Sequence, residues 1–226
     1  MGRRFITFIS YILNSIVGLI YCGMEKCIIC DAEVEEDYIC PSCNSSMKIS
    51  YLSYNLKQND EEYKCFSLGY YSYSIKKLVL ALKYKKNFSA GLVIAKYLSD
   101  FLKNEFKDEF DILTFVPSSK ESLQKRGFNQ CEVVCKNISK DINRKCISLL
   151  KKVKFSRDQI GLTTNERWDN IKDSFSCINS KLVEGKNILL IDDVVTTGAT
   201  AFYCASTLKR AGAKDVYILT VAKSRV

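Results

Sequence analysis

Two adjacent carboxylates, Asp192 and Asp193, follow an apolar run and precede a short loop rich in threonine. The segment 188–200 reads ILLIDDVVTTGAT, so that the acids are followed by Val194, Val195, Thr196, Thr197, Gly198, Ala199 and Thr200. Ionised carboxylates accept hydrogen bonds from sugar hydroxyls, whereas hydroxyls, backbone N–H groups and a helix N-terminus bind phosphate. The segment therefore predicts a sugar-phosphate site, and its alternative is an ordinary turn that caps a helix.

Apolar periodicity predicts the elements that position these residues. We expect strands at 111–116, 146–150, 174–178, 186–191 and 216–221, and helices at 75–83, 89–106, 127–141 and 199–211. Strands that alternate with helices imply an α/β fold with a doubly wound parallel sheet covered on both faces. Because ligands bind beyond the carboxyl ends of strands in such sheets, Asp192 and Asp193 are expected at the ligand-binding edge.

Two CxxC pairs, Cys27 with Cys30 and Cys40 with Cys43, form the second chemical feature. Their spacing predicts tetrahedral thiolate coordination of structural Zn²⁺, with an iron–sulfur cluster as the less favoured alternative. Four thiolates leave no open coordination position, so this site is expected to stabilise a small four-cysteine, zinc-ribbon-like element rather than to catalyse. The chain has 11 cysteines and no histidine, which excludes catalysis by a Cys–His pair or a Ser–His–Asp triad.

The length of 226 residues suits one α/β domain and a small appendage. We expect an apolar helix over 1–22, the four-cysteine element with a polar connection over 23–64, and the α/β domain over 65–226. The apolar stretch 5–21 is short for a membrane span, so membrane contact is less favoured than a helix buried against the domain or a partner. A small-x-small cleavage site is missing before Cys22, and the many cysteines indicate a reducing compartment, so we expect a cytoplasmic protein.

Basic side chains are grouped in two further segments of a chain whose formal net charge is +9. The segment 116–130 follows a predicted strand and so lies at the same edge of the sheet, where its Lys120, Lys125 and Arg126 either bind an anion or form the solvated start of a helix. The segment 144–157 contains cations and no acid. It can contact a nucleic-acid backbone together with Lys83, Lys85 and Lys86, or form a solvated face.

These motifs together resemble those of a known family. The segment 188–200 resembles the PRPP-binding motif of type I phosphoribosyltransferases. More of the chain is similar to the ComF family of competence-type, amidophosphoribosyltransferase-like proteins. The hallmarks of that family are present as Val116-Pro117, Arg126-Gly-Phe-Asn-Gln130, Gln159 with Leu162, Arg167 with Asn170, Phe175 and the cysteine-rich N-terminus.

The resemblance implies a type I phosphoribosyltransferase-like fold that binds PRPP or ribose 5-phosphate with Mg²⁺. It makes Asp192 and Asp193 the catalytic pair and 194–200 the phosphate loop. Pro117, Lys120, Lys125, Arg126 and Gly127 then occupy the place of the pyrophosphate loop. Lys152 belongs to a hood over the ligand, at a position where an arginine is common in the family.

The resemblance leaves two functions open. One is transfer of a phosphoribosyl group from PRPP to an acceptor that no motif in the chain identifies. The other is a non-catalytic or regulatory role in DNA uptake during natural transformation, with single-stranded DNA and a DNA-uptake helicase as expected partners.

Overall fold

A computed structural model describes residues 25–35, 37–106, 109–153, 168 and 171–225. The expected helix over 1–22 lies outside the described residues, as do Lys154 and Arg157 of the basic segment and the hallmarks Gln159, Leu162, Arg167 and Asn170. In the part of the chain that is described, no helix is long and apolar enough to cross a membrane.

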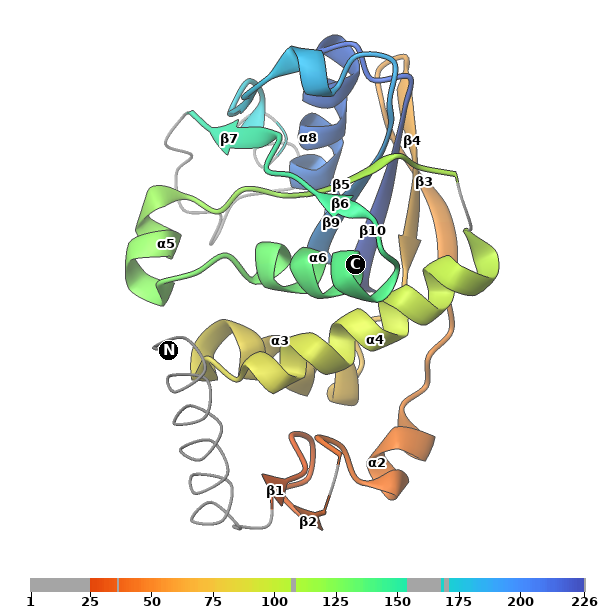
Figure 1. The fold of residues 1–226 in the computed structure, drawn as a ribbon, viewed down its shortest axis with the longest axis vertical. Helices are drawn as coiled ribbons and strands as arrows, with labels where there is room; N and C mark the ends of the chain where they lie inside the picture. The colour runs from red at the N-terminus through yellow and green to blue at the C-terminus, as the bar shows by residue number, and fades with distance from the viewer. Residues whose placement is uncertain (1–24, 36, 107–108, 154–167, 169–170, 226) are drawn as a thin grey trace, which may run out of the picture.

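A six-stranded sheet with the order β3-β4-β10-β9-β5-β6 forms the centre of the molecule (Figure 1). Its strands are β3 (Leu52–Gln58), β4 (Glu61–Ser67), β5 (Ile112–Phe115), β6 (Lys145–Cys146), β9 (Asn187–Val195) and β10 (Asp215–Lys223). Strand β9 pairs in parallel with β10 on one side and with β5 on the other, and only the β3–β4 pair of this sheet is antiparallel. The carboxyl ends of β5, β9 and β10 therefore meet at one edge.

Helices cover both faces of this sheet, as predicted. Helices α3 (Tyr73–Lys85), α4 (Phe88–Glu105) and α6 (Gln130–Asp141) lie on one face, and α8 (Ala199–Arg210) lies on the other. Strand β9 packs against the helices on both faces. Leu189 and Ile191 belong to the buried core beneath α3, α4 and α6, and Ile188 and Leu190 belong to the core beneath α8. This strand is buried on both faces, which explains why it reads as a continuous apolar run.

The segment 44–64, which the sequence predicted to be a polar connection, instead contains β3 and most of β4. The two strands form a hairpin whose register pairs Leu56 with Tyr63 across a turn at Asn59 and Asp60. Leu56 and Tyr63 are buried in the core beneath α8, whereas alternate residues face solvent. Those exposed polar residues concealed the strands, because a half-buried strand has only every second side chain in the core.

The strand expected at 146–150 is divided into two short strands. β6 ends at Cys146 on the edge of the main sheet, and β7 (Leu150–Lys152) pairs antiparallel with β8 (Phe175–Cys177) as a separate ribbon. The strand expected to end at Ile191 continues to Val195, so both acidic residues lie within β9. A 3₁₀ helix (Ser180–Leu182) connects β8 to β9, and a short helix α5 (Lys120–Arg126) stands between β5 and α6.

The four-cysteine element consists of β1 (Glu25–Lys26), β2 (Glu33–Val34) and α2 (Pro41–Ser46). It lies next to α4 in Figure 1, and its residues Ile29, Val34, Ile39 and Met47 belong to the same buried core as that helix. The Tyr97 hydroxyl on α4 also donates a hydrogen bond to Asn44. The element is therefore packed against the α/β sheet domain rather than tethered to it.

Candidate functional site

A cleft of about 480 Å³ opens at the carboxyl ends of β5 and β9. Its walls come from the ends of β5 and β9, the helices α3, α5 and α6, the start of α8 and the loop before it. The lining residues are Tyr71, Lys83, Val116, Pro117, Ser118, Ser122, Arg126, Gln130, Cys131, Asp192 to Ala201 and Ser224. The cleft thus lies where parallel strands deliver their last residues, as expected for a doubly wound sheet.

The turn from β9 into α8 depends on Gly198. Its φ of +86° belongs to the left-handed region, and a Cβ atom here would stand 2.6 Å from Cδ2 of Leu56 on β3. Glycine is therefore required both by the backbone and by close packing against the β3–β4 hairpin. The turn directs the first N–H groups of α8, which have no carbonyl partners within the helix, towards the cleft. An anionic group is the natural ligand for them.

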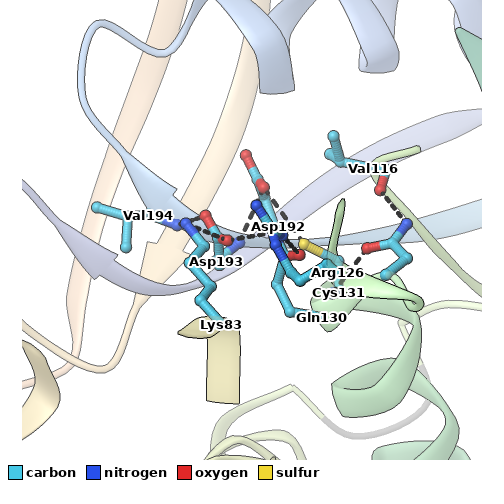
Figure 2. A network of polar contacts seen from close by, with 9 residues as sticks. Lys83, Val116, Arg126, Gln130, Cys131, Asp192, Asp193 and Val194 are labelled. Carbon is cyan, nitrogen blue, oxygen red and sulfur yellow. Dashed lines mark hydrogen bonds and ion pairs between the residues drawn. The ribbon is translucent and has the colours of Figure 1, made fainter. Parts of the chain in front are cut away.

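Asp193 is held by partners from two different helices (Figure 2). Lys83 Nζ of α3 stands 2.6 Å from Asp193 Oδ2, and Gln130 Nε2 of α6 donates to the same oxygen at 2.6 Å. Arg126 in turn donates to the side-chain oxygen of Gln130. The other oxygen of Asp193 accepts the backbone N–H of Val194 at 2.6 Å. A chain of polar contacts therefore connects the expected diphosphate segment to the acidic pair.

Asp192 is more deeply buried than Asp193, with 8% of its surface exposed. Its Oδ1 accepts the backbone N–H of Asp193 at 2.8 Å and lies 3.6 Å from the Cys131 thiol. Burial, followed by the charge of Asp193, raises the pKa of Asp192 to about 7. Burial alone would lower the pKa of Lys83, but the charge and hydrogen bond of Asp193 outweigh it and raise that pKa. Near neutral pH the pair therefore sits between one and two negative charges, balanced by one cation.

Asn129 positions the helix that carries Gln130 and Cys131. Its side chain donates to the carbonyl of Val116 at 2.9 Å and accepts the N–H of Cys131 at 2.9 Å. It caps α6 and ties that helix to the end of β5 while only 4% of its surface is exposed. The asparagine of the RGFNQ block is thus structural, and the glutamine after it reaches the acidic pair.

Comparison with known proteins agrees with this arrangement. The family model described as the phosphoribosyl transferase domain matches residues 129–225. Competence protein F of Haemophilus influenzae is 23% identical over 88% of this chain and 90% of its own length. DNA utilization protein YhgH of Escherichia coli K12 is 26% identical over 88% of this chain and 90% of its own length. Competence protein ComFC of Bacillus subtilis is 29% identical, but the match covers only 58% of this chain and 54% of that protein.

The chain belongs to the ComF family. Its α/β domain has the type I phosphoribosyltransferase fold, as the family model and the sheet with helices on both faces indicate. Among solved structures, the adenine phosphoribosyltransferase of Thermoanaerobacter pseudethanolicus is similar with a TM-score of 0.39 and 13% identity over 78% of this chain and 96% of that chain.

In this ComF-family protein, most of the predicted ligand-binding residues line the cleft. Asp192, Asp193, the segment 194–200, Pro117 and Arg126 are all in its wall. Lys120 and Lys125 are exposed on α5, and Gly127 ends that helix with a φ of +83° and open space around it. Lys152 is half-buried on β7, where burial lowers its pKa. These last four residues are not in the wall of the cleft formed by the described part of the chain.

The most consequential residue of the cleft missed by the site prediction is Lys83. The sequence placed it among cations that could contact nucleic acid, but the structure places it on the acidic pair. A signal was present, because Ile75, Val79 and Lys83 are spaced four residues apart on the buried side of α3. A lysine on an apolar helix face requires a partner. Tyr71, Ser118, Ser122, Cys131 and Ser224 were also missed, and their types carry no such signal.

The four-cysteine cluster of this ComF-family protein is closed and compact. The sulfurs of Cys27, Cys30, Cys40 and Cys43 all lie within 4.8 Å of one another, and those of Cys30 and Cys40 are 3.7 Å apart. A tetrahedral zinc site with Zn–S distances of about 2.3 Å has sulfur–sulfur edges of roughly 3.8 Å, so these residues fit the ion.

Backbone N–H groups around Cys27 favour its thiolate form. Burial alone would raise the pKa of Cys27, but N–H groups of Cys40, Cys30 and Ile29 lower it to about 6. The cluster thus offers an anionic sulfur in a buried position, which is the ligand type that zinc prefers and is consistent with a zinc ribbon.

Proposed function

We propose that the cleft binds PRPP or ribose 5-phosphate. The observation that carries this proposal is that an acidic pair at the end of β9 and the N-terminus of α8 share one cleft. Acceptors and donors are separated within it: carboxylates lie on the strand, whereas N–H groups and threonine hydroxyls lie on the loop. A ribose phosphate has the matching division into hydroxyl donors and an anionic group.

Asp192 and Asp193 accept the ribose hydroxyls in this proposal, and Thr196 to Thr200 bind the 5′-phosphate. Arg126 faces the cleft from α5, where a guanidinium can hold a diphosphate through two parallel hydrogen bonds. Mg²⁺ would enter with the substrate, and Asp192 and Asp193 are the carboxylates of the cleft wall that would lie near it; the ion would supply positive charge that neutralises the diphosphate. A structural Zn²⁺ in the four-cysteine cluster completes the proposed set of ions.

We further propose transfer of the phosphoribosyl group to an acceptor. The acceptor atom forms a bond to the sugar's anomeric carbon while the bond from that carbon to the diphosphate oxygen breaks, and the diphosphate leaves with the electron pair. Positive charge then develops on the sugar ring, where nearby carboxylates lower its energy. The acidic pair on β9 is suited to that task because it lies in the wall of the cleft, where Lys83 holds the Asp193 carboxylate in place at 2.6 Å.

Calorimetry with PRPP and Mg²⁺ tests this proposal. The wild-type protein should bind PRPP, and Asp193→Asn should weaken binding by roughly 10- to 100-fold because charge-assisted hydrogen bonds to the diol are lost. Asp60→Asn, in the exposed turn of the hairpin, is the matched control and should bind as the wild type does. Absence of binding by the wild type, or equal affinity of Asp193→Asn, would exclude this use of the cleft.

The second proposed function is the handling of single-stranded DNA during uptake, together with a helicase partner. The names of the relatives refer to competence and DNA utilization. The protein also has exposed aromatic rings beside cations: Lys77 lies 5.5 Å from the ring centre of Tyr73, and Arg225 lies 4.7 Å from that of Tyr70. Such pairs suit stacking of bases beside a phosphate backbone.

Anisotropy of a labelled single strand at several salt concentrations tests this second function. Affinity should fall steeply with salt, and Tyr73→Ala should weaken binding by about 5-fold or more through loss of stacking. Tyr51→Ala is the control, because Tyr51 is also exposed but packs against Phe101. A strand that fails to bind even at low salt contradicts the proposal.

A further inference from the structure

A second pair of cysteines lies in contact away from the cleft and from the four-cysteine cluster. The sulfur atoms of Cys135 and Cys146 are 2.8 Å apart. Cys135 lies on α6 and is fully buried, whereas Cys146 is the last residue of the edge strand β6 and is partly exposed. Their contact follows from the β5–α6–β6 unit, which returns the chain next to its own helix.

The metal-binding explanation that fits the four-cysteine cluster does not fit this pair. Among the described residues, the cluster of Cys27, Cys30, Cys40 and Cys43 is the only group of three or more potential ligands close enough to hold an ion. Two thiols without further ligands do not make a zinc site. What two such thiols can do is form a bond to each other.

We propose that Cys135 and Cys146 form a reversible disulfide by exchange with a low-molecular-weight disulfide such as oxidised glutathione. Cys146 is the attacking residue because the edge position of β6 leaves it accessible, whereas Cys135 is enclosed by α6 and the sheet. Cys135 also lies 3.8 Å from the carbonyl of Thr114 on β5, so it is held towards the strand side of its helix.

The acid–base properties of the two thiols agree with these roles. Contact with Cys135 outweighs partial burial and, together with the charge of Lys136, lowers the pKa of Cys146. Burial, followed by the contact with Cys146, raises the pKa of Cys135 well above its usual range. The thiolate is the nucleophile in exchange, so the exposed member of the pair is also the reactive one.

The exchange proceeds in two steps. The Cys146 thiolate attacks one sulfur of the small disulfide, whose S–S bond breaks, and the first thiolate leaves with the electron pair and takes up a proton. Cys135 then loses its proton and attacks the Cys146 sulfur, which expels the second small thiol. Two protein thiols are oxidised, one small disulfide is reduced to two thiols, and a small dithiol reverses the reaction.

The bond would join α6, whose first turn lines the cleft, to the edge of the sheet. Helix α6 begins with Gln130 and Cys131, which hold the acidic pair, and Cys135 lies about one turn further along it. Among the residues that the structure describes, strand β6 contains only Lys145 and Cys146 and pairs with β5 alone. A covalent link at this point closes the β5–α6–β6 unit and strengthens its least supported strand.

Peptide mass spectrometry of the full-length protein tests the proposal. The reduced protein is incubated with increasing oxidised glutathione, blocked with a thiol reagent and digested. We expect a peptide pair linked through Cys135 and Cys146 to be the first internal disulfide to form, and to disappear after treatment with dithiothreitol. A pair that stays reduced while other described cysteines become linked overturns the proposal.

Substitutions separate the two roles. Cys146→Ser should abolish the link and leave Cys135 unmodified, whereas Cys135→Ala should accumulate a glutathione adduct on Cys146. Cys177→Ser, at another partly exposed cysteine, is the matched control and should keep the link. Modification of Cys135 in the Cys146→Ser protein would contradict the assigned order of attack.

Thermal unfolding supplies a second measurement that does not depend on digestion. Closing this short loop should raise the melting temperature of the oxidised wild type by about 5–10 °C over the reduced form. The Cys146→Ser protein should show no such shift under the same treatment. An oxidised wild type that contains the link but melts at the same temperature would refute the stabilising role of the bond.

Discussion

The cleft and the four-cysteine cluster are two polar sites built in opposite ways. In the cluster, four sulfurs of like kind converge within 4.8 Å, and no position remains open to a substrate. In the cleft, charged groups of opposite sign hold one another through Lys83 and Asp193, and a volume of about 480 Å³ remains open beside them. The comparison teaches that a site whose groups all contact one another stabilises the fold. A site that keeps an open volume beside its charged groups can bind a ligand instead.

The largest expected effect concerns the closed site. Cys27→Ser should lower the free energy of unfolding by roughly 4 kcal/mol or more, because a structural ion contributes its binding energy to folding. Cys27 is fully buried in the core that joins the four-cysteine element to α4, so the loss should spread to that interface. Denaturant unfolding together with zinc analysis measures it, and Cys177→Ser is the control. A Cys27→Ser protein that keeps both its zinc and its free energy of unfolding would show that the four-cysteine cluster does not stabilise the fold.

A second effect concerns the loop 196–200 of the open site, which we propose to bind phosphate. Gly198→Ala should weaken PRPP binding by about 3 kcal/mol, since the added Cβ meets Leu56 and the φ is unfavourable. Calorimetry measures the change. Gly185→Ala has a similar positive φ of +68° but open space around it, so it should retain wild-type affinity. Equal loss in both proteins would mean that backbone strain, and not the position of the loop, controls binding.

The third effect is a pH dependence of stability. The pKa of Asp192 is raised from an ordinary carboxyl value to about 7, so the folded state binds its proton more tightly than the unfolded state does. Stability therefore falls as pH rises between about 4 and 7, and the loss between pH 5 and pH 8 should be roughly 2–3 kcal/mol.

Asp192→Asn removes this titration. The variant should be more stable than the wild type at pH 8, and its advantage should shrink towards pH 5. Thermal unfolding at the two pH values measures both, with Asp60→Asn as the exposed control. A constant difference between Asp192→Asn and the wild type at all pH values would show that Asp192 is not the titrating group.

The smallest effect concerns Lys83, the cation that contacts the acidic pair. Lys83→Met should lower the free energy of unfolding by about 2 kcal/mol at pH 8, because the largely buried Asp193 carboxylate loses its cationic partner. The cost should be smaller at pH 5, where the acidic pair can take up a proton instead. Lys85→Met, on the exposed side of the same helix, is the control. If Lys83→Met and Lys85→Met behave alike in denaturant unfolding, the ion pair does not support the acidic pair.

Much of the central architecture could be predicted from local patterns. Strand β9 is a continuous apolar run, α4 and α8 show helical spacing, and the acidic pair with the loop after it forms a single contiguous motif. The β3–β4 hairpin was missed because its burial is one-sided. The split between β6 and β7 was missed because a run of similar residues does not show where the chain leaves one sheet for another.

The sequence by itself determined which groups can bind: two carboxylates before a threonine-rich loop that contains Gly198, and two CxxC pairs. Only the tertiary structure decided which distant residues complete them. Lys83 comes to Asp193 because α3 packs over the end of β9, Leu56 makes Gly198 obligatory because β3 joins the sheet, and Cys135 meets Cys146 because α6 turns back along β5. Such contacts depend on how whole elements pack, and no local sequence pattern encodes that packing.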